Sequence, residues 1–354
     1  MWVARTPPQV VRTTQSLPPA DVGGPDHTTG SPSHPVAPQE PVRPPNGPAR
    51  GGYAGSVTAP APAPRPTLAD WLEGARLRTL PAAIAPVLAG TGMAGADADA
   101  LLAALAVIVA LALQIGVNFA NDYSDGIRGT DSDRVGPTRL TASGLVTPRS
   151  VKLLAFAFFA LAGAAGVALS LLAGTWYLIL VGVVCVIAAW YYTGGRSPYG
   201  YRGLGEVAVF VFFGWVATLG TTFTQTLEIT WSAFLAGTGM GLIACALLMV
   251  NNLRDIATDE VAGKHTLAVR LGVRQARTTY VALVLGGSAV CVGALVATWH
   301  WTYLLVVPLG IFALVVSSRV LRGDTGRALV PVLRDTGLLQ LGFGIVLGLG
   351  AVLA

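Results

Sequence analysis

The stretch that decides the fold is ALLAALAVIVALALQIGVNFANDYSDGIRGTDSDR, residues 100–134, in which a long apolar run leads directly into a cluster of acids. Its first part, about residues 100–120, contains no charged side chain. A helix of that length, at about 1.5 Å per residue, crosses a hydrocarbon layer roughly 30 Å thick. The stretch therefore predicts a membrane-spanning helix that carries polar side chains to one membrane surface.

Apolar runs of this kind recur along the whole chain. Hydrophobic residues make up 53% of the 354 residues and charged residues only 12%, against about 25% charged in a typical soluble domain. This composition predicts an all-α, multi-pass transmembrane bundle of about nine helices. The expected spans are 80–96, 100–120, 151–172, 176–193, 204–223, 232–251, 278–298, 301–320 and 336–353.

The basic residues indicate the orientation of the bundle. Of the 23 Lys and Arg residues, 22 fall before residue 79 or in the loops 122–150, 194–203, 252–277 and 319–335, and Lys152 lies at the adjoining start of the span 151–172. The alternate loops contain none, and loops rich in Lys and Arg remain in the cytoplasm. We therefore expect a cytoplasmic amino terminus and an external carboxyl terminus. The net charge of +5 has this explanation and does not indicate nucleic-acid binding.

The first 66 residues differ in composition from the rest. They are rich in Pro, Gly, Ser and Thr, as in the stretch PAPAPRP at residues 60–66, and they lack the apolar run of a signal peptide. Such a composition cannot bury enough apolar surface to form a core. We expect a disordered tail over residues 1–66 and a transmembrane domain over residues 67–354.

Two segments place Asn and Asp at helical spacing. In the first, Asn118, Asn121, Asp122 and Asp125 follow one another at i, i+3, i+4 and i+7, which puts them on one helix face. The second, NNLRDIATDEVAGKHT at residues 251–266, repeats the arrangement with Asn251, Asp255 and Asp259. Rows of acids at the end of an apolar helix are costly, at roughly 2.5–3.5 kcal/mol for an Asp at the helix centre. The two rows therefore predict a cationic partner.

Oxygen-rich rows suit a hard divalent cation. Mg²⁺ commonly takes one or two carboxylates together with substrate phosphates, so the two rows are candidates to hold Mg²⁺ against a diphosphate. The candidate metal ligands are Asn118, Asn121, Asp122, Asp125, Asn251, Asp255 and Asp259.

Basic and aromatic residues follow the acidic rows. Guanidinium and ammonium groups bind phosphate oxygens, and we expect Arg139 and Lys264 to do so, because they lie in the most patterned stretches. Further candidates to contact substrate are Arg128, Asp131, Arg134, Tyr191, Tyr192, Glu206 and Arg270. Tyr191 and Tyr192 also suit the aromatic belt of a membrane interface, and Glu206 is the one acid of its apolar run.

With these motifs in view, residues 67–354 resemble the UbiA superfamily of intramembrane prenyltransferases, and most closely its MenA branch, which prenylates 1,4-dihydroxy-2-naphthoate. The resemblance rests on NFANDYSDGIRGTD, GPTRLTASGLVT, YTGGRSPYGYRGLGE and NNLRDIATDEVAGKHTLAVRLG. The superfamily's first motif usually has a third acid where Gly129 stands here, and Asp131 follows two residues later. MenA-like sequences share this departure. The second motif falls on Asp255 and Asp259 unchanged.

The resemblance implies a function and a mechanism. Asp122, Asp125, Asp255 and Asp259 would hold Mg²⁺ on a polyprenyl diphosphate, with Arg139 and Lys264 on its phosphate oxygens. The allylic C–O bond would ionise, and the ring of 1,4-dihydroxy-2-naphthoate would capture the cation with loss of CO₂, giving demethylmenaquinone for menaquinone biosynthesis. The expected location is the bacterial inner (cell) membrane, with the site facing the cytoplasm and the lipid tail in a groove open to the bilayer.

Three alternatives remain open on the sequence. Another aromatic acceptor of the same superfamily, such as 4-hydroxybenzoate, a chlorophyllide or a haem, is one. A secondary transporter is another, since transporters also use buried acids and repeated halves; their charges, however, usually lie near the midplane. A non-catalytic scaffold gives no reason for paired rows of Asp.

Overall fold

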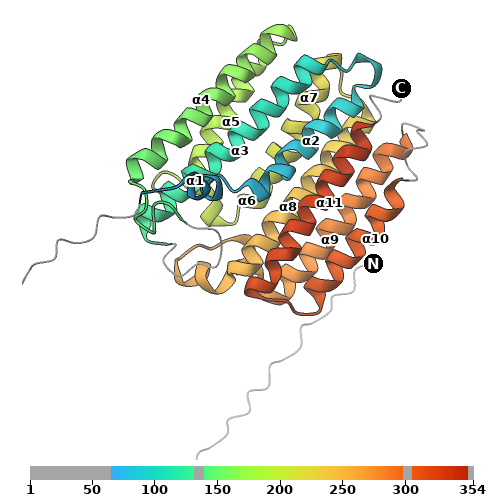
Figure 1. The fold of residues 1–354 in the computed structure, drawn as a ribbon. Coiled ribbons are helices and arrows are strands. Elements are labelled where there is room, and N and C mark those ends of the chain that lie inside the picture. The colour runs from blue at the N-terminus through green and yellow to red at the C-terminus, as the bar shows by residue number, and fades with distance from the viewer. Residues whose placement is uncertain (1–64, 131–138, 298–304, 350–354) are drawn as a thin grey trace, which may run out of the picture. The chain divides into compact units, whose positions relative to one another are not determined.

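The computed structural model describes residues 65–130, 139–297 and 305–349, and within these ranges every regular element is helical. Figure 1 shows a bundle of long helices running side by side. Besides short 3-10 turns, the elements are α1 (Leu68–Gly74), α2 (Leu80–Met93), α3 (Ala100–Arg128), α4 (Pro148–Leu172), α5 (Leu178–Tyr191), α6 (Gly205–Val209), the π-helical η4 (Phe210–Val216), α7 (Ala217–Thr226), α8 (Trp231–Val261), α9 (Leu267–Ala297), α10 (Val306–Leu321) and α11 (Leu329–Gly348).

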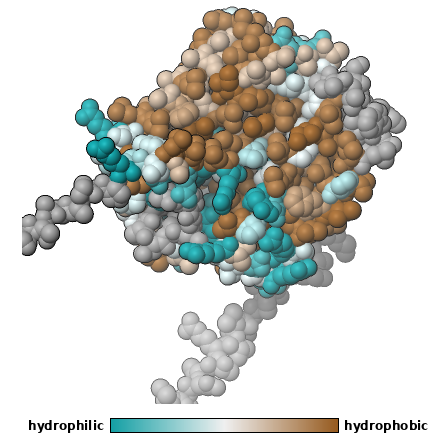
Figure 2. Space-filling model, in the orientation of Figure 1, coloured by the Kyte–Doolittle hydropathy of each residue, from teal (hydrophilic) through white to brown (hydrophobic). Residues whose placement is uncertain are grey.

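The predicted all-α membrane architecture is confirmed. Six described helices are long and apolar enough to cross a membrane, and α5 and α10 are shorter apolar helices. Apolar side chains cover much of the surface in Figure 2, and polar ones gather over its lower half. The orientation of the termini stays a prediction. The predicted tail lies outside the described residues apart from its last two, Arg65 and Pro66.

Helices α8 and α9 extend beyond the spans expected from hydropathy, and for α8 the helical spacing of Asp255 and Asp259 had predicted this. The expected spans stopped at residue 251 and began at residue 278, whereas α8 continues to Val261 and α9 begins at Leu267. Hydropathy detects the part of a helix that lies in hydrocarbon, and both helices continue beyond that part as polar helix. Most of the predicted loop 252–277 is therefore helical, and a break at Gly272, with φ of 72°, divides α9.

Side-chain caps fix where the main helices begin. Asp99 accepts a hydrogen bond from the backbone N–H of Leu102 at 2.9 Å and starts α3. Thr230 caps α8 in the same way through Ala233 N at 3.2 Å. At the other end of α3, Gly129 takes the left-handed conformation, with φ of 70°, that commonly terminates a helix.

Small residues bring the helices of the core close together. The largest core cluster joins α2, α8, α9, α10 and α11 and includes the fully buried Met240, Tyr280 and Phe343. A Cβ atom added to Gly239 would lie 2.9 Å from Gly287 O and from Cys291 N, and one added to Gly344 would lie 2.6 Å from Ala85 O. Association of helices in lipid depends on such close backbone approach.

A second core cluster forms around Phe119, Leu140 and Phe159 and packs α3 against α4. The acidic row of α3 therefore belongs to one group of helices and that of α8 to the other. In Figure 1 the ends of α3 and α8 that carry these rows lie at the same end of the bundle.

The close approach of α8 and α9 gives a test of the packing. Gly239→Ala should destabilise the protein by about 1–3 kcal/mol, because the added methyl overpacks against backbone that cannot move away. Gly293→Ala is the matched control on α9, since no atom lies within 4 Å of its added Cβ. Gly293→Ala should leave the free energy of unfolding unchanged or raise it by up to about 1 kcal/mol. Thermal unfolding in detergent measures both, and equal midpoints for the two variants would contradict the described packing.

Candidate active site

The two acidic rows meet at the polar end of one cavity of about 650 Å³. Residues of α3, α8 and the segments that follow α5 and α8 surround the polar end. They are Asn118, Asn121, Asp125, Thr193, Tyr201, Asn251, Asn252, Asp259 and Lys264. Beyond them the cavity is lined mainly by Ala, Gly, Val and Leu of α2, α3, α4, α5 and α7. One end thus suits a charged group and the rest suits a hydrocarbon chain.

An ion pair between Asp125 and Lys264 joins the two groups of helices. Lys264 Nζ lies 3.1 Å from Asp125 Oδ2, and the two side chains are only 3% and 4% exposed. Lys264 follows the turn that ends α8, and its backbone N–H donates to Asp259 O at 2.8 Å. The short segment at the end of α8 therefore carries Asp259 and also places Lys264 against Asp125 of α3. This contact holds the acidic row of α8 beside the acidic row of α3.

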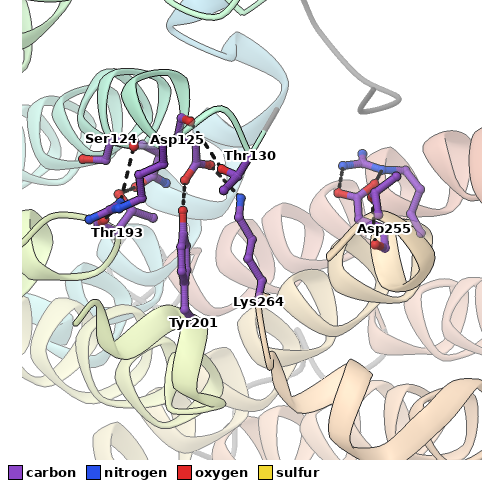
Figure 3. A network of polar contacts seen from close by, with 11 residues as sticks. Ser124, Asp125, Thr130, Thr193, Tyr201, Asp255 and Lys264 are labelled. Carbon is purple, nitrogen blue, oxygen red and sulfur yellow. Dashed lines mark hydrogen bonds and ion pairs between the residues drawn. The ribbon is translucent and has the colours of Figure 1, made fainter. Parts of the chain in front are cut away.

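Tyr201 completes this cluster, as Figure 3 shows. Its hydroxyl donates to the other carboxylate oxygen of Asp125, and Lys264 Nζ lies 4.8 Å from the centre of its ring. Burial, followed by the negative charge of Asp125, raises the pKa of Tyr201 above its ordinary value of 10.0. The phenol therefore keeps its proton, and donates it to Asp125, throughout the physiological range. Tyr201 was not among the substrate contacts predicted from the sequence, although it lies in the quoted YGYRGLGE stretch.

Asp122 does not line the cavity in the described structure. Its Oδ2 accepts from Leu140 N at 2.9 Å and its Oδ1 from Thr141 N at 2.8 Å. A carboxylate that accepts two buried backbone N–H groups fixes the position of that backbone. Asp122 thus holds the turn that begins at Arg139, and its predicted role as a metal ligand stays a prediction.

Asp255 is likewise set apart from the Asp125 cluster, as Figure 3 shows. Arg254 pairs with it in bidentate fashion, through Nε at 2.7 Å and Nη2 at 2.6 Å. Both side chains are buried, at 8% and 2% exposure. Of the four predicted acids, Asp125 and Asp259 therefore line the cavity, whereas Asp122 and Asp255 contact protein groups beside it. Arg254 was not predicted, because a single Arg beside an Asp has no distinctive spacing.

The predicted Asn residues have different partners. Asn118 donates to Ala75 O at 2.9 Å and to Thr79 Oγ1 at 3.2 Å, which ties α3 to the segment before α2. Asn121 accepts a hydrogen bond from Thr193 Oγ1 at 2.7 Å. Asn118, Asn121 and Asn251 all line the cavity.

The remaining tyrosine and acidic candidates differ in how close they lie to the cavity. Tyr192 lines the cavity, and Glu206 lies behind it, where one carboxylate oxygen accepts from Asn252 Nδ2 at 3.3 Å. Tyr191 is 51% exposed and suits the interfacial belt instead. Asp131 and Arg134 lie outside the described residues.

Arg128 and Arg270 contact backbone in this structure. The guanidinium of Arg128 donates to the carbonyl oxygens of Thr193 and Gly195 and so ties α3 to the loop after α5. Arg270 Nε donates to His265 O at 3.1 Å. Arg128 thus stabilises the loop that forms this wall of the cavity. Its predicted contact with substrate stays a prediction.

The donor set fits a hard divalent cation completed by a ligand. Within the described ranges no group of three or more His, Cys, Asp and Glu side chains has metal-holding spacing. Mg²⁺ needs no such group, because it retains water and uses one or two carboxylates together with phosphate oxygens. Asp125 and Asp259 supply carboxylates, and Asn121 and Asn251 supply amide oxygens, at one end of one cavity.

Comparison with known proteins agrees with this architecture. The profile of the UbiA prenyltransferase family matches residues 83–333. A 1,4-dihydroxy-2-naphthoate octaprenyltransferase from Mycobacterium tuberculosis is 52% identical over 278 residues, which cover 78% of this chain and 94% of that protein. The protein of the same name from Escherichia coli is 40% identical over 295 residues, which cover 79% of this chain and 94% of that protein.

Solved structures share the fold at lower identity. A UbiA homolog from Archaeoglobus fulgidus bound to DMAPP and Mg²⁺ superposes with a TM-score of 0.60 at 15% identity, covering 80% of this chain and 100% of that one. The family profile spans more than half of the chain, and two relatives of at least 40% identity are covered almost completely. The chain therefore belongs to the UbiA prenyltransferase family.

Proposed function

We propose that the protein transfers a polyprenyl group from polyprenyl diphosphate to 1,4-dihydroxy-2-naphthoate, with loss of CO₂ and diphosphate, in menaquinone biosynthesis. The observation that carries the proposal is a cavity with acids from two groups of helices at one end and an apolar lining along the rest. The curated relatives with 52% and 40% identity are named for this acceptor. The names of these relatives favour the naphthoate over other acceptors.

The polar end would hold the diphosphate. Asp125, Asp259, Asn121 and Asn251 would hold Mg²⁺, which when bound neutralises negative charge that develops on the leaving diphosphate. Lys264 is already buried against Asp125 at 3.1 Å. From this position Lys264 would also donate to a phosphate oxygen. Arg139, on the turn that Asp122 holds, would act in the same way.

The reaction balances in electrons and atoms. The allylic C–O bond breaks and its electron pair leaves with the diphosphate. The ring carbon that bears the carboxylate forms the new C–C bond, the carboxylate departs as CO₂, and its bonding pair returns to the ring. The immediate product is the quinol form of demethylmenaquinone. The apolar cavity excludes water, which would otherwise capture the allyl cation.

The site would face the cytoplasm of a bacterial cell. The charged segments around Asp125 and Lys264 are those that the positive-inside rule assigns to the cytoplasm. A soluble aromatic acid would therefore reach the polar end from the cytoplasm, while the prenyl chain would lie in the bilayer-depth part of the cavity.

Replacing either cavity acid should abolish most turnover. Asp125→Asn and Asp259→Asn should each lower kcat/KM by roughly 100-fold or more, because several kcal/mol of charge stabilisation is lost and each 1.36 kcal/mol corresponds to a factor of ten. Glu260→Gln is the matched control, since Glu260 is the exposed neighbour of Asp259. Purified protein with Mg²⁺, a polyprenyl diphosphate and 1,4-dihydroxy-2-naphthoate, followed by mass spectrometry, measures the effect. Wild-type turnover in both Asn variants would remove these acids from the mechanism.

The acceptor is tested by competition. Wild-type protein offered 1,4-dihydroxy-2-naphthoate and 4-hydroxybenzoate together should prenylate the naphthoate and release CO₂, because the relatives that match over most of their length are named for this acceptor. Omitting Mg²⁺ and adding a chelator should stop the reaction. Product from 4-hydroxybenzoate alone would contradict the naphthoate assignment while leaving prenyl transfer intact.

A further inference from the structure

The apolar part of the cavity has an unusual lining of glycine from three different helices. Gly163 of α4, Gly182 of α5 and Gly220 of α7 all line it. These residues lie inside helices with ordinary backbone angles, so no turn or positive φ requires glycine there. Glycine in a helix interior is less favourable than alanine by roughly a factor of five.

Helix packing does not explain these three glycines. A Cβ atom added to Gly239, Gly344 or Gly214 would lie within 3.0 Å of neighbouring backbone atoms, so those positions exclude a side chain. A Cβ atom added to Gly163, Gly182 or Gly220 would have no heavy atom within 4 Å. A side chain that starts there would extend from a Cβ atom that touches no protein atom, into a position that lines the cavity.

Gly182 and Gly163 lie at bilayer depth, well away from the polar end. Gly182 precedes the end of α5 at Tyr191 by about 14 Å along the helix, from the rise of 1.5 Å per residue. Gly163 follows the start of α4 at Pro148 by about 22 Å on the same basis. Both reference ends lie on the side of the bundle that carries Asp125. A chain that begins at the polar end therefore reaches Gly182 before Gly163.

Helix α5, which lines this part of the cavity, is loosely packed. Within α5, Cys185 is the one residue that is buried, and its neighbours Val183 and Val184 are 49% and 50% exposed. Because much of α5 has no protein packed against it, the apolar space beside this helix is open to the side. An extended hydrocarbon chain can fill that space. A shorter cavity, or one closed by larger side chains, would accept only the first units of such a chain.

We propose that Gly163, Gly182 and Gly220 determine how long a prenyl chain the enzyme accepts, by keeping the deep part of the cavity open. This inference rests on the proposed function and adds the selection of donor length to it. A side chain at Gly182 obstructs the path nearer the polar end than one at Gly163, so it excludes shorter donors as well as long ones. The chemistry at the diphosphate end is common to all donors and does not discriminate between them.

The test compares donors of different length in matched variants. Gly182→Leu, Gly163→Leu and Gly220→Leu are assayed with geranyl, farnesyl and octaprenyl diphosphate and with 1,4-dihydroxy-2-naphthoate. The ratio of kcat/KM for octaprenyl to that for geranyl diphosphate should fall by at least about tenfold in each, the lower end of what one methylene brings in an apolar pocket. The kcat/KM for farnesyl diphosphate should fall further in Gly182→Leu than in Gly163→Leu.

Gly293→Leu is the control, because Gly293 is a helix-interior residue of α9 with equal room for a Cβ atom that does not line the cavity. In Gly293→Leu the ratio of kcat/KM for octaprenyl to that for geranyl diphosphate should equal that of the wild type. Three variants on three helices protect the test against the loss of any one through misfolding, and each is checked by size-exclusion chromatography. Active variants with an unchanged ratio would overturn the inference and leave the proposed function standing. A wild type that prenylates no acceptor with any donor would overturn the proposed function, and the inference with it.

Discussion

The arrangement of the site depends on a buried ion pair between Lys264 and Asp125, whose nitrogen and oxygen lie 3.1 Å apart. Each charge alone would be costly to bury, and each is stabilised by the other and by the hydroxyl and ring of Tyr201. Because Lys264 follows α8 directly and Asp125 lies on α3, this contact brings the acidic rows of two groups of helices to one end of one cavity. The proposed diphosphate site exists only where these two segments meet.

Several polar residues around the site act on the protein backbone. Asp122 holds the turn after Arg139, Arg128 holds the loop at Thr193 and Gly195, and Asn118 holds the segment before α2. Such contacts fix the walls around Asp125 and Asp259 before any ligand binds, and preorganised charges stabilise a leaving group without rearrangement. The motif residues of this chain therefore fall into those that face the cavity and those that position its walls.

The fold could be predicted from the sequence because hydropathy and length identify membrane helices directly. The Asn and Asp rows could be placed on helix ends for the same reason. Their partners could not be predicted, because helical spacing gives a shared face and leaves open what packs against it. Asp122 and Asp125 are three residues apart, yet one contacts a loop and the other a lysine 139 residues further along the chain. Hydropathy did not detect the polar ends of α8 and α9, because helix beyond the membrane has no apolar signature, and the spacing of Asp255 and Asp259 indicated only that of α8.

The central claim is that Asp125 and Asp259 hold a divalent cation against a diphosphate. Crystals grown with Mn²⁺ and a non-hydrolysable polyprenyl diphosphate analogue test it directly by anomalous diffraction. The account predicts an anomalous peak within about 2.0–2.6 Å of a carboxylate oxygen of Asp125 or Asp259, the range found for hard divalent cations, with diphosphate oxygens on its other side. A bound diphosphate with its metal distant from both carboxylates would contradict the account.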